Sequence, residues 1–294
     1  MTPTAPAAFQ PLKGIRILSL ALNLPGPAAL MRCRQMGATC LKLEPPGGDP
    51  MLQYNPTAYR QLHDGIELLA ADLKTEAGQQ QLHRELAQAD VLITSFRPSA
   101  LIKLGLTWQA LHLQHLKLSQ IAIVGAPGER GEEAGHDLTY LAENDLVTGL
   151  ELPATLYADM GGSLMASEAV LRAVMHQRSQ GTGVYLEIAL SGAAGYLALP
   201  RAWGLSQPGA AIGGGHAGYR VYPCQDGRVA LAALEPHFAL RLCTAAGVKA
   251  ASSMQTMFEP ATHEAVAAFL LRRTRRELDA LAVEKDIPLC TLGN

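Results

Sequence analysis

Short apolar runs alternate with helical patterns through the first half of the chain. The apolar runs have the length of buried strands, and the segments between them place apolar residues at helical spacing. The predicted elements are strands at residues 14–22, 39–44, 90–94 and 118–124 and helices at residues 27–36 and 79–89. Strands that alternate with helices predict a parallel sheet covered on both faces, which is a doubly wound α/β domain.

The loops that follow these strands are the expected location of a ligand site. In open parallel sheets, ligands bind at the carboxyl ends of the strands. The loops concerned are Asn23-Leu24-Pro25-Gly26, Ser95-Phe96-Arg97 and Gly125-Ala126-Pro127. We therefore expect these three segments to form the rim of one site.

The second half of the chain has a different pattern. It is predicted to contain a long buried helix at residues 159–180, a strand at residues 184–189, an alanine-rich helix from Ser191, a hairpin of residues 219–224 and 228–233 around Gln225-Asp226-Gly227, and helices from about Glu235 and from His263 to Val283. A glycine-rich stretch without periodicity, residues 207–218, separates the two parts. The expected organisation is a large domain at residues 1–200, a linker at residues 201–218 and a small α+β domain at residues 219–294.

Composition excludes several classes of function. The chain has 294 residues, 48% hydrophobic and 17% charged, with a net charge of −2, which provides no basic surface for nucleic acid or an anionic membrane. No apolar run is long enough to span a membrane, and residues 1–10 lack the features of a signal peptide. The five cysteines are scattered, so we expect reduced thiols, a cytoplasmic protein and no metal site.

Two common cofactor motifs are absent. No GxGxxG follows the first strand, and no GxxxxGK[ST] occurs in the chain, so a nicotinamide or P-loop nucleotide enzyme is disfavoured. Glycosidase chemistry would need two facing carboxylates, whereas Glu132 and Glu133 are adjacent in a loop and are predicted to be solvated.

Candidate chemistry is concentrated in Gly135-His136-Asp137 and in Asp159, which precedes Gly161-Gly162. An imidazole and a carboxylate that face one substrate suit proton transfer by two bases, or a carboxylate nucleophile with a helper. The alternative is a structural histidine beside an aspartate that caps a helix. If Asp159 begins a helix, free amides near it are expected to lower its pKa.

A series of motifs resembles the family III coenzyme A transferases (CaiB/BaiF), whose members include formyl-CoA transferase, carnitine CoA-transferase and α-methylacyl-CoA racemase. The resemblance covers nearly the whole chain and preserves the order of the motifs. The matching segments are residues 11–18, Pro25-Gly26-Pro27-Ala28, residues 42–50, Asp72-Leu73-Lys74, residues 89–93, Phe96-Arg97-Pro98, Leu104-Gly105-Leu106, Gly135-His136-Asp137-Leu138 and residues 158–162.

The resemblance implies an acyl-CoA-dependent enzyme, closest to the racemase branch. Racemases of the family pair a histidine, here His136, with an aspartate, here Asp159, and place a glutamate, here Glu235, near the histidine. Asp137 is expected to supply a backbone N–H to the enolate oxygen. In the transferase alternative, Asp159 attacks the thioester and His136 is incidental.

The resemblance also implies a coenzyme A site and a homodimer of interlocked chains. Lys74 and Lys103 match positions expected to contact the phosphates, and Phe96 and Arg97 lie beside the adenine end. Coenzyme A enters as part of the acyl-CoA substrate, and no metal, nicotinamide, flavin or pyridoxal group is expected. No nucleic acid or membrane partner is expected.

Departures from the family pattern keep a third reading open. Relatives continue for several dozen residues past the position of Asn294, Ser95 replaces a common Asn, and Ser191-Gly192 replaces a common Asp-Gly. A non-catalytic CoA-binding paralogue is the expectation under this reading. The acyl group cannot be assigned from the residues, so branched fatty acyl, bile-acid, aryl-propionyl and dicarboxylic acyl groups all stay open.

Overall fold

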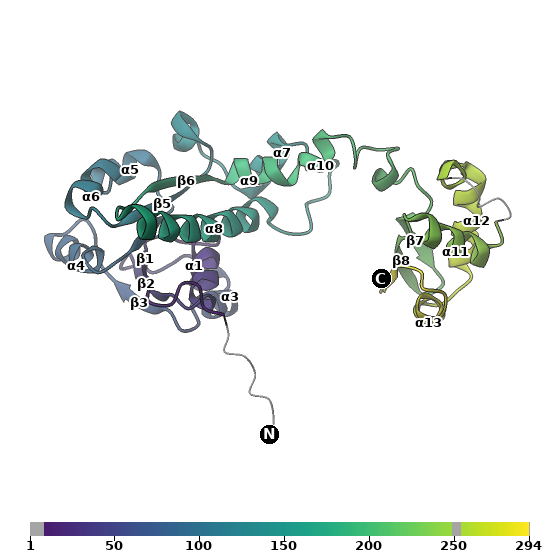
Figure 1. The fold of residues 1–294 in the computed structure, drawn as a ribbon, viewed down its shortest axis with the longest axis horizontal. Coiled ribbons are helices and arrows are strands. Elements are labelled where there is room, and N and C mark those ends of the chain that lie inside the picture. The colour runs from purple at the N-terminus through teal and green to yellow at the C-terminus, as the bar shows by residue number, and fades with distance from the viewer. Residues whose placement is uncertain (1–8, 249–253, 294) are drawn as a thin grey trace, which may run out of the picture. The chain divides into compact units, whose positions relative to one another are not determined.

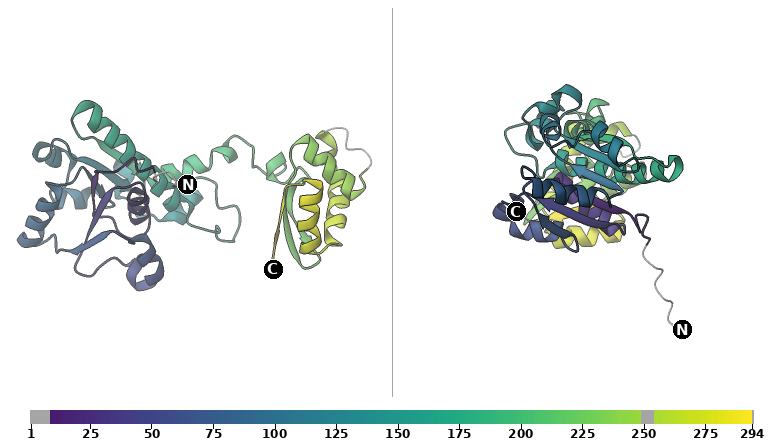
Figure 2. Two further views of the ribbon diagram at one scale, coloured as in Figure 1. Left: turned by 60° about the horizontal axis from the view of Figure 1, so that its bottom comes forward. Right: turned by 90° about the vertical axis from the view of Figure 1, so that its left-hand side faces the viewer.

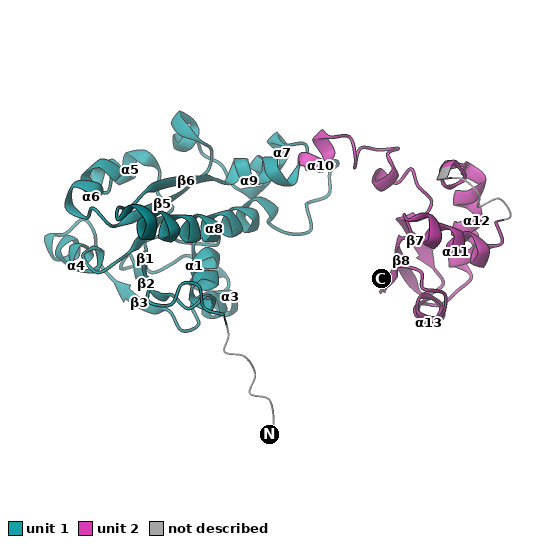
Figure 3. Cartoon of the chain, in the orientation of Figure 1, with its two compact units in different colours: residues 1–198 teal, residues 199–294 magenta. Residues whose placement is uncertain are grey.

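The computed structural model describes residues 9–248 and 254–293. The chain divides into two compact units, Met1–Ala198 and Leu199–Asn294 (Figure 3). The first unit holds a parallel sheet with helices, and the second holds a small antiparallel sheet with helices.

The sheet of the first unit has the strand order β3-β2-β1-β4-β5-β6, and every neighbouring pair is parallel (Figure 1). Its strands are β1 (Arg16–Ser19), β2 (Thr39–Glu44), β3 (Glu67–Ala70), β4 (Val91–Thr94), β5 (Ser119–Val124) and β6 (Tyr185–Ala189). Ile17 of β1 lies opposite Cys40 of β2 on one side and Val91 of β4 on the other. From β1 the strands are added first on one side, as β2 and β3, and then on the other, as β4, β5 and β6. The strand order therefore reverses between β1 and β4, and the predicted doubly wound α/β fold is confirmed.

Helices cover both faces of this sheet (Figure 1). They are α1 (Pro25–Gln35), α2 (Met51–Tyr54), α3 (Pro56–Leu62), α4 (Glu76–Leu86), α5 (Pro98–Lys103), α6 (Trp108–Gln114), the 3₁₀ helix η1 (Gly128–Glu132), α7 (Asp137–Glu143), α8 (Tyr157–Gln180) and α9 (Leu190–Leu197). One core packs α1 and α8 on the sheet through buried residues such as Ile17, Leu30 and Val170. The opposite core packs α4, α5 and α6 through Leu82, Leu101 and Leu111.

Local sequence explains where α1 begins and where α8 ends. Pro25 and Pro27 occupy the first turn of α1, where a missing N–H has no cost. Helix α8 ends at Gly181, whose φ of 75° lies in the left-handed region that glycine tolerates. Strand β3 was not predicted because it is a four-residue edge strand, mostly exposed, whose apolar run from Leu68 to Ala70 is too short to indicate a buried strand.

The second unit packs its helices on one face of its sheet, as the left view of Figure 2 shows. Its elements are α10 (Leu199–Ala202), η2 (Ala211–Gly213), β7 (Tyr219–Cys224), β8 (Gly227–Ala232), α11 (Pro236–Ala246), η3 (Met254–Phe258), α12 (Pro260–Leu271), α13 (Arg275–Lys285) and β9 (Leu289–Leu292). The predicted hairpin is confirmed, because β7 and β8 pair antiparallel around Gln225 and Asp226.

The single helix predicted from His263 to Val283 is wrong. Two helices, α12 and α13, occupy this segment. Thr274 caps the second helix, because its hydroxyl accepts from the backbone N–H of Glu277 and its own N–H donates to the Glu277 carboxylate. This reciprocal pair starts a new helix inside the polar run of residues 272–277.

The five cysteines are free thiols, and all but Cys290 are buried. Within residues 9–248 and 254–293, no helix has the length and hydropathy needed to cross a membrane.

Candidate active site

A cavity of about 640 Å³ opens at the carboxyl end of the parallel sheet. The loops after β1, β4 and β5 supply Asn23, Ser95, Arg97 and Gly125 to its lining. These loops were predicted as the rim of a site, and the structure brings them together. Apolar side chains make up much of the remaining wall, among them Leu22, Leu24, Met51, Ile123, Leu156 and Leu190.

His136 stands at the edge of the cavity as the residue before α7. Its backbone N–H donates to the Thr139 hydroxyl at 3.1 Å, and that hydroxyl donates to the His136 carbonyl at 2.7 Å. Thr139 thereby fixes the backbone at the helix entrance, and His136 is an exposed residue of the cavity lining. The position of His136 is thus set by the start of α7.

Asp159 enters the same cavity from the first turn of α8. The residue before this helix is Leu156, whose side chain cannot cap it. The buried carboxylate of Asp137 caps the helix in its place, because Asp137 Oδ1 accepts a hydrogen bond from the Asp159 backbone N–H at 2.9 Å. Asp137 therefore joins α7 to the start of α8 and places His136 and Asp159 on adjoining parts of one wall.

The pKa of Asp159 is raised from its usual 3.8 to about 6. Burial is the largest cause, and the negative charge of Asp137 adds to it, while His136 acts in the opposite direction. The expectation that the helix N-terminus lowers this pKa is wrong. Desolvation and a neighbouring carboxylate outweigh the helix dipole at this site.

Tyr140 is a wall residue that the sequence analysis did not single out. It lies on α7 one turn after His136, and its side chain is 6% exposed. Two glycines make room for it: a Cβ added to Gly125 would lie 2.2 Å from the Tyr140 hydroxyl, and one added to Gly135 would lie 2.6 Å from the ring. Burial and the nearby Asp159 raise the Tyr140 pKa, so its hydroxyl stays protonated and can donate a hydrogen bond into the cavity.

Tyr54 also lines the cavity and was missed, whereas Asn23 lies in a loop that was predicted as part of the rim. The Tyr54 hydroxyl donates to Asn23 Oδ1 at 3.0 Å. Asn23 has a φ of 65°, in the left-handed region that asparagine tolerates better than most residues. The i, i+4 spacing of His136 and Tyr140 was a usable signal, whereas nothing in the sequence pairs Tyr54 with Asn23.

The other predicted site residues are distributed more widely. Phe96 and Arg97 line the cavity, whereas Lys74 and Lys103 are exposed and lie outside its lining. Glu235 is exposed at the residue before α11, in the second unit, so it belongs to a different compact part of the chain from His136.

The predicted solvated pair, Glu132 and Glu133, has defined contacts. The Glu132 carboxylate accepts from the Ser99 backbone N–H and hydroxyl at the start of α5. Glu133 lines the cavity and pairs with Arg130 at 2.9 Å. Among the described residues of the lining, the charged side chains are therefore Arg97, Glu133 and Asp159.

One group of side chains in the described part of the chain has the donor set of a metal site: Glu44, Asp49 and His63. All three are buried, and none of them lines the cavity. The candidate active site therefore contains acid–base groups, with the metal-like donor set placed behind it.

Comparison with known proteins identifies the fold and the family. The profile of CoA-transferase family III matches residues 12–294. A solved structure of the hypothetical protein Rv3272 from Mycobacterium tuberculosis superposes with a TM-score of 0.85 at 23% identity, covering 97% of this chain and 86% of that one.

Two curated relatives differ in their named activities. The probable fatty acyl-CoA transferase Rv3272 of Mycobacterium tuberculosis is 30% identical over 64% of this chain, and the match spans only 52% of the relative, about half of its length. The α-methylacyl-CoA racemase of Mus musculus is 28% identical over 90% of this chain and 73% of the relative. Transferases and racemases therefore both occur among the similar proteins.

Proposed function

The chain belongs to CoA-transferase family III, and we propose that it is an acyl-CoA racemase that inverts the α-carbon of a 2-methylacyl-CoA thioester. The observation that carries this proposal is that His136 and Asp159 line one cavity. An imidazole and a carboxylate can each accept or donate a proton, and together they provide the two bases that inversion requires.

The chemistry follows from the acidity of a carbon next to a thioester. One base removes the α-proton, and the electron pair of the C–H bond moves onto the thioester oxygen as an enolate. The other group, already protonated, returns a proton to the opposite face of the carbon. The roles of His136 and Asp159 exchange with the handedness of the substrate.

The raised pKa of Asp159 supports this exchange of roles. A racemase runs equally in both directions, so each base must serve as acceptor in one direction and as donor in the other. A carboxyl group whose pKa is raised to about 6 can donate a proton more readily near neutral pH than a carboxyl group with its usual pKa of 3.8.

Asp137 has two parts in the proposal. Its side chain holds the Asp159 backbone at the start of α8. Its own N–H lies in the first turn of α7, where helical N–H groups lack intrahelical partners, and we assign it to the enolate oxygen. Glu235 is proposed as an orienting carboxylate for a catalytic imidazole, a role supported by the motif around it.

Coenzyme A is proposed to bind along the rim of the same unit. Phe96 and Arg97 line the cavity; the Phe96 ring suits contact with the adenine of coenzyme A, and the Arg97 guanidinium suits contact with a phosphate. Lys74 and Lys103 are exposed and are proposed to contact phosphates outside the cavity.

A homodimer is part of the proposal, supported by exposed apolar side chains of the first unit such as Leu164 and Tyr196. Light scattering checks it, with twice the mass of one chain expected.

The experiment that tests the reaction class is chemical trapping at Asp159. In a transferase, the Asp159 carboxylate attacks the thioester carbon, the C–S bond breaks and CoA leaves as the thiolate, giving a mixed anhydride. Hydroxylamine would convert that adduct to a hydroxamate, visible by peptide mass. The proposal predicts no adduct with 2-methylacyl-CoA. An adduct on Asp159 near one per chain would make the protein a transferase.

A further inference from the structure

Lys42 is a fully buried cation in the parallel sheet, on the strand next to the edge strand β3. It lies on β2, its side chain is 0% exposed, and its Nζ is 2.5 Å from Asp49 Oδ2, 3.0 Å from Glu44 Oε1 and 2.9 Å from His63 Nε2. An ammonium group has three donor protons, and these contacts use all of them. Such a group is stable in the interior only with this degree of compensation.

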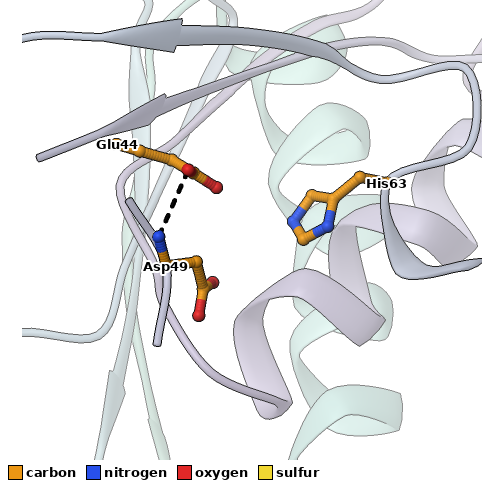
Figure 4. Close-up of side chains that lie close together, drawn as sticks. All are labelled: Glu44, Asp49 and His63. Carbon is orange, nitrogen blue, oxygen red and sulfur yellow. Dashed lines mark hydrogen bonds between the residues drawn. The ribbon is translucent and has the colours of Figure 1, made fainter. Parts of the chain in front are cut away.

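The partners of Lys42 form the metal-like donor set, which Figure 4 shows converging on one space. Their ligand atoms lie within 4.8 Å of one another. The Lys42 ammonium lies within hydrogen-bond distance of all three residues. Lys42 therefore provides the positive charge that a metal ion would provide at such a donor set.

The protonation state of His63 agrees with this arrangement. Its Nδ1 lies 2.7 Å from the Tyr59 carbonyl oxygen, so Nδ1 carries the proton and Nε2 accepts from Lys42. Burial and the Lys42 charge lower the His63 pKa, which keeps the ring neutral. The Tyr59 hydroxyl donates to Glu44 Oε1 at 3.0 Å and completes the set.

A chain of hydrogen bonds leads from this buried cluster to the cavity. The Asp49 carboxylate accepts from the Asn23 backbone N–H at 3.1 Å and from the Met51 N–H at 2.9 Å. Asn23 then accepts from the Tyr54 hydroxyl. Asn23, Met51 and Tyr54 all line the cavity, on segments other than those that carry His136 and Asp159.

We propose that Lys42 is a positioning residue, an internal cation that holds Asp49 and through it fixes Asn23, Met51 and Tyr54 as the substrate-binding wall of the cavity. The proposal rests on the proposed function, because the wall is taken to contact the acyl-CoA. Loss of the cation is expected to weaken substrate binding, seen in KM, more than the chemical step, seen in kcat, since the two bases stand on α7 and α8.

The test is to replace the internal cation with an external one. Lys42→Ala leaves Glu44, Asp49 and His63 as two carboxylates and an imidazole around a vacated space, and such a set binds divalent transition metals. We expect Lys42→Ala to bind one Co²⁺ per chain with a visible absorption spectrum and a raised melting temperature. The wild-type protein should do neither, and Lys42→Ala with His63→Leu should lose the effect.

Substrate binding supplies the second measurement. Lys42→Ala without metal is expected to raise KM for acyl-CoA at least tenfold with a smaller change in kcat, and Co²⁺ should restore KM. An unchanged KM in Lys42→Ala, or Co²⁺ uptake that leaves KM impaired, would overturn the positioning role. Tyr54→Phe leaves the buried cluster intact and should raise KM alone; a fall confined to kcat would contradict the proposal.

The experiments distinguish failure of the proposed function from failure of the proposed role of Lys42. Co²⁺ uptake and melting temperature are measured with no acyl-CoA present. If Lys42→Ala takes up Co²⁺ while the wild-type protein neither binds nor turns over acyl-CoA, the proposed function is wrong and the proposed role of Lys42 as the internal cation is retained. If Lys42→Ala takes up no Co²⁺ while the wild-type enzyme is active, the proposed role of Lys42 is wrong and the proposed function is retained.

Discussion

The carboxylate of Asp137 accepts a hydrogen bond from the backbone N–H of Asp159 at 2.9 Å. This one contact joins the start of α7 to the start of α8 and therefore sets where two candidate bases stand. It also brings two carboxylates close together, which contributes to the raised pKa of Asp159. Asp137 thus contributes both to the position of Asp159 and to its raised pKa.

Substitution of Asp137 separates these two effects. Asp137→Asn keeps an oxygen that can accept from the Asp159 N–H but removes the charge, so the Asp159 pKa should fall toward its usual value with little loss of stability. Asp137→Ala also removes the cap and should cost about 1 kcal/mol more, as lost N-caps do. Urea unfolding and the pH profile of kcat/KM measure the two quantities. Equal stability of the Asn and Ala variants would show that the cap contributes nothing.

Stability should depend on pH through Asp159. The folded state holds the Asp159 proton up to a pH of about 6, whereas the unfolded state releases it near 3.8. Between these values the folded state binds more protons, so the free energy of unfolding falls as pH rises and then levels off. Asp159→Asn should remove this slope and be more stable than wild type at pH 7. An Asn variant less stable than wild type at pH 7 would contradict the raised pKa.

The fit between Tyr140 and its two glycines gives a further test. Gly125→Ala would place a Cβ 2.2 Å from the Tyr140 hydroxyl oxygen but 3.1 Å from the ring carbon that carries it, so adding Tyr140→Phe should relieve most of the clash. Gly135→Ala would meet a ring carbon at 2.6 Å, and Tyr140→Phe should not relieve it. Each single glycine change should cost about 1–3 kcal/mol, as overpacking does. Thermal unfolding of the four variants checks the pattern, and equal rescue at both glycines would refute it.

Much of the architecture could be predicted because it depends on local pattern. Alternating apolar runs and helices determine a parallel sheet, and the rule that ligands bind at strand ends located Asn23, Arg97 and Gly125 correctly. The edge strand β3 was not predicted because its apolar run, Leu68 to Ala70, is too short to indicate a strand. The break at Thr274 was not predicted because Leu271 and Leu278, on either side of the polar run, are seven residues apart and so keep the helical spacing.

The less predictable features depend on contacts between distant segments. Asp137 was singled out for its backbone N–H at the start of α7, and only the folded chain shows that its side chain caps α8. Lys42 was included in a buried strand, but its partners Asp49 and His63 lie on later segments. Hydrogen bonds between side chains on different elements do not change the spacing of apolar residues, so the sequence pattern does not reveal them.

The most direct test of the central claim follows the α-hydrogen of 2-methylacyl-CoA in deuterated water by NMR. The account predicts that the wild-type protein exchanges this hydrogen in both enantiomers, without any acceptor acid. His136→Ala should lose exchange from one enantiomer and Asp159→Asn from the other, because each base serves one face of the carbon. Exchange from both enantiomers at the wild-type rate in His136→Ala, or CoA transfer without exchange in the wild-type protein, would contradict the two-base racemase.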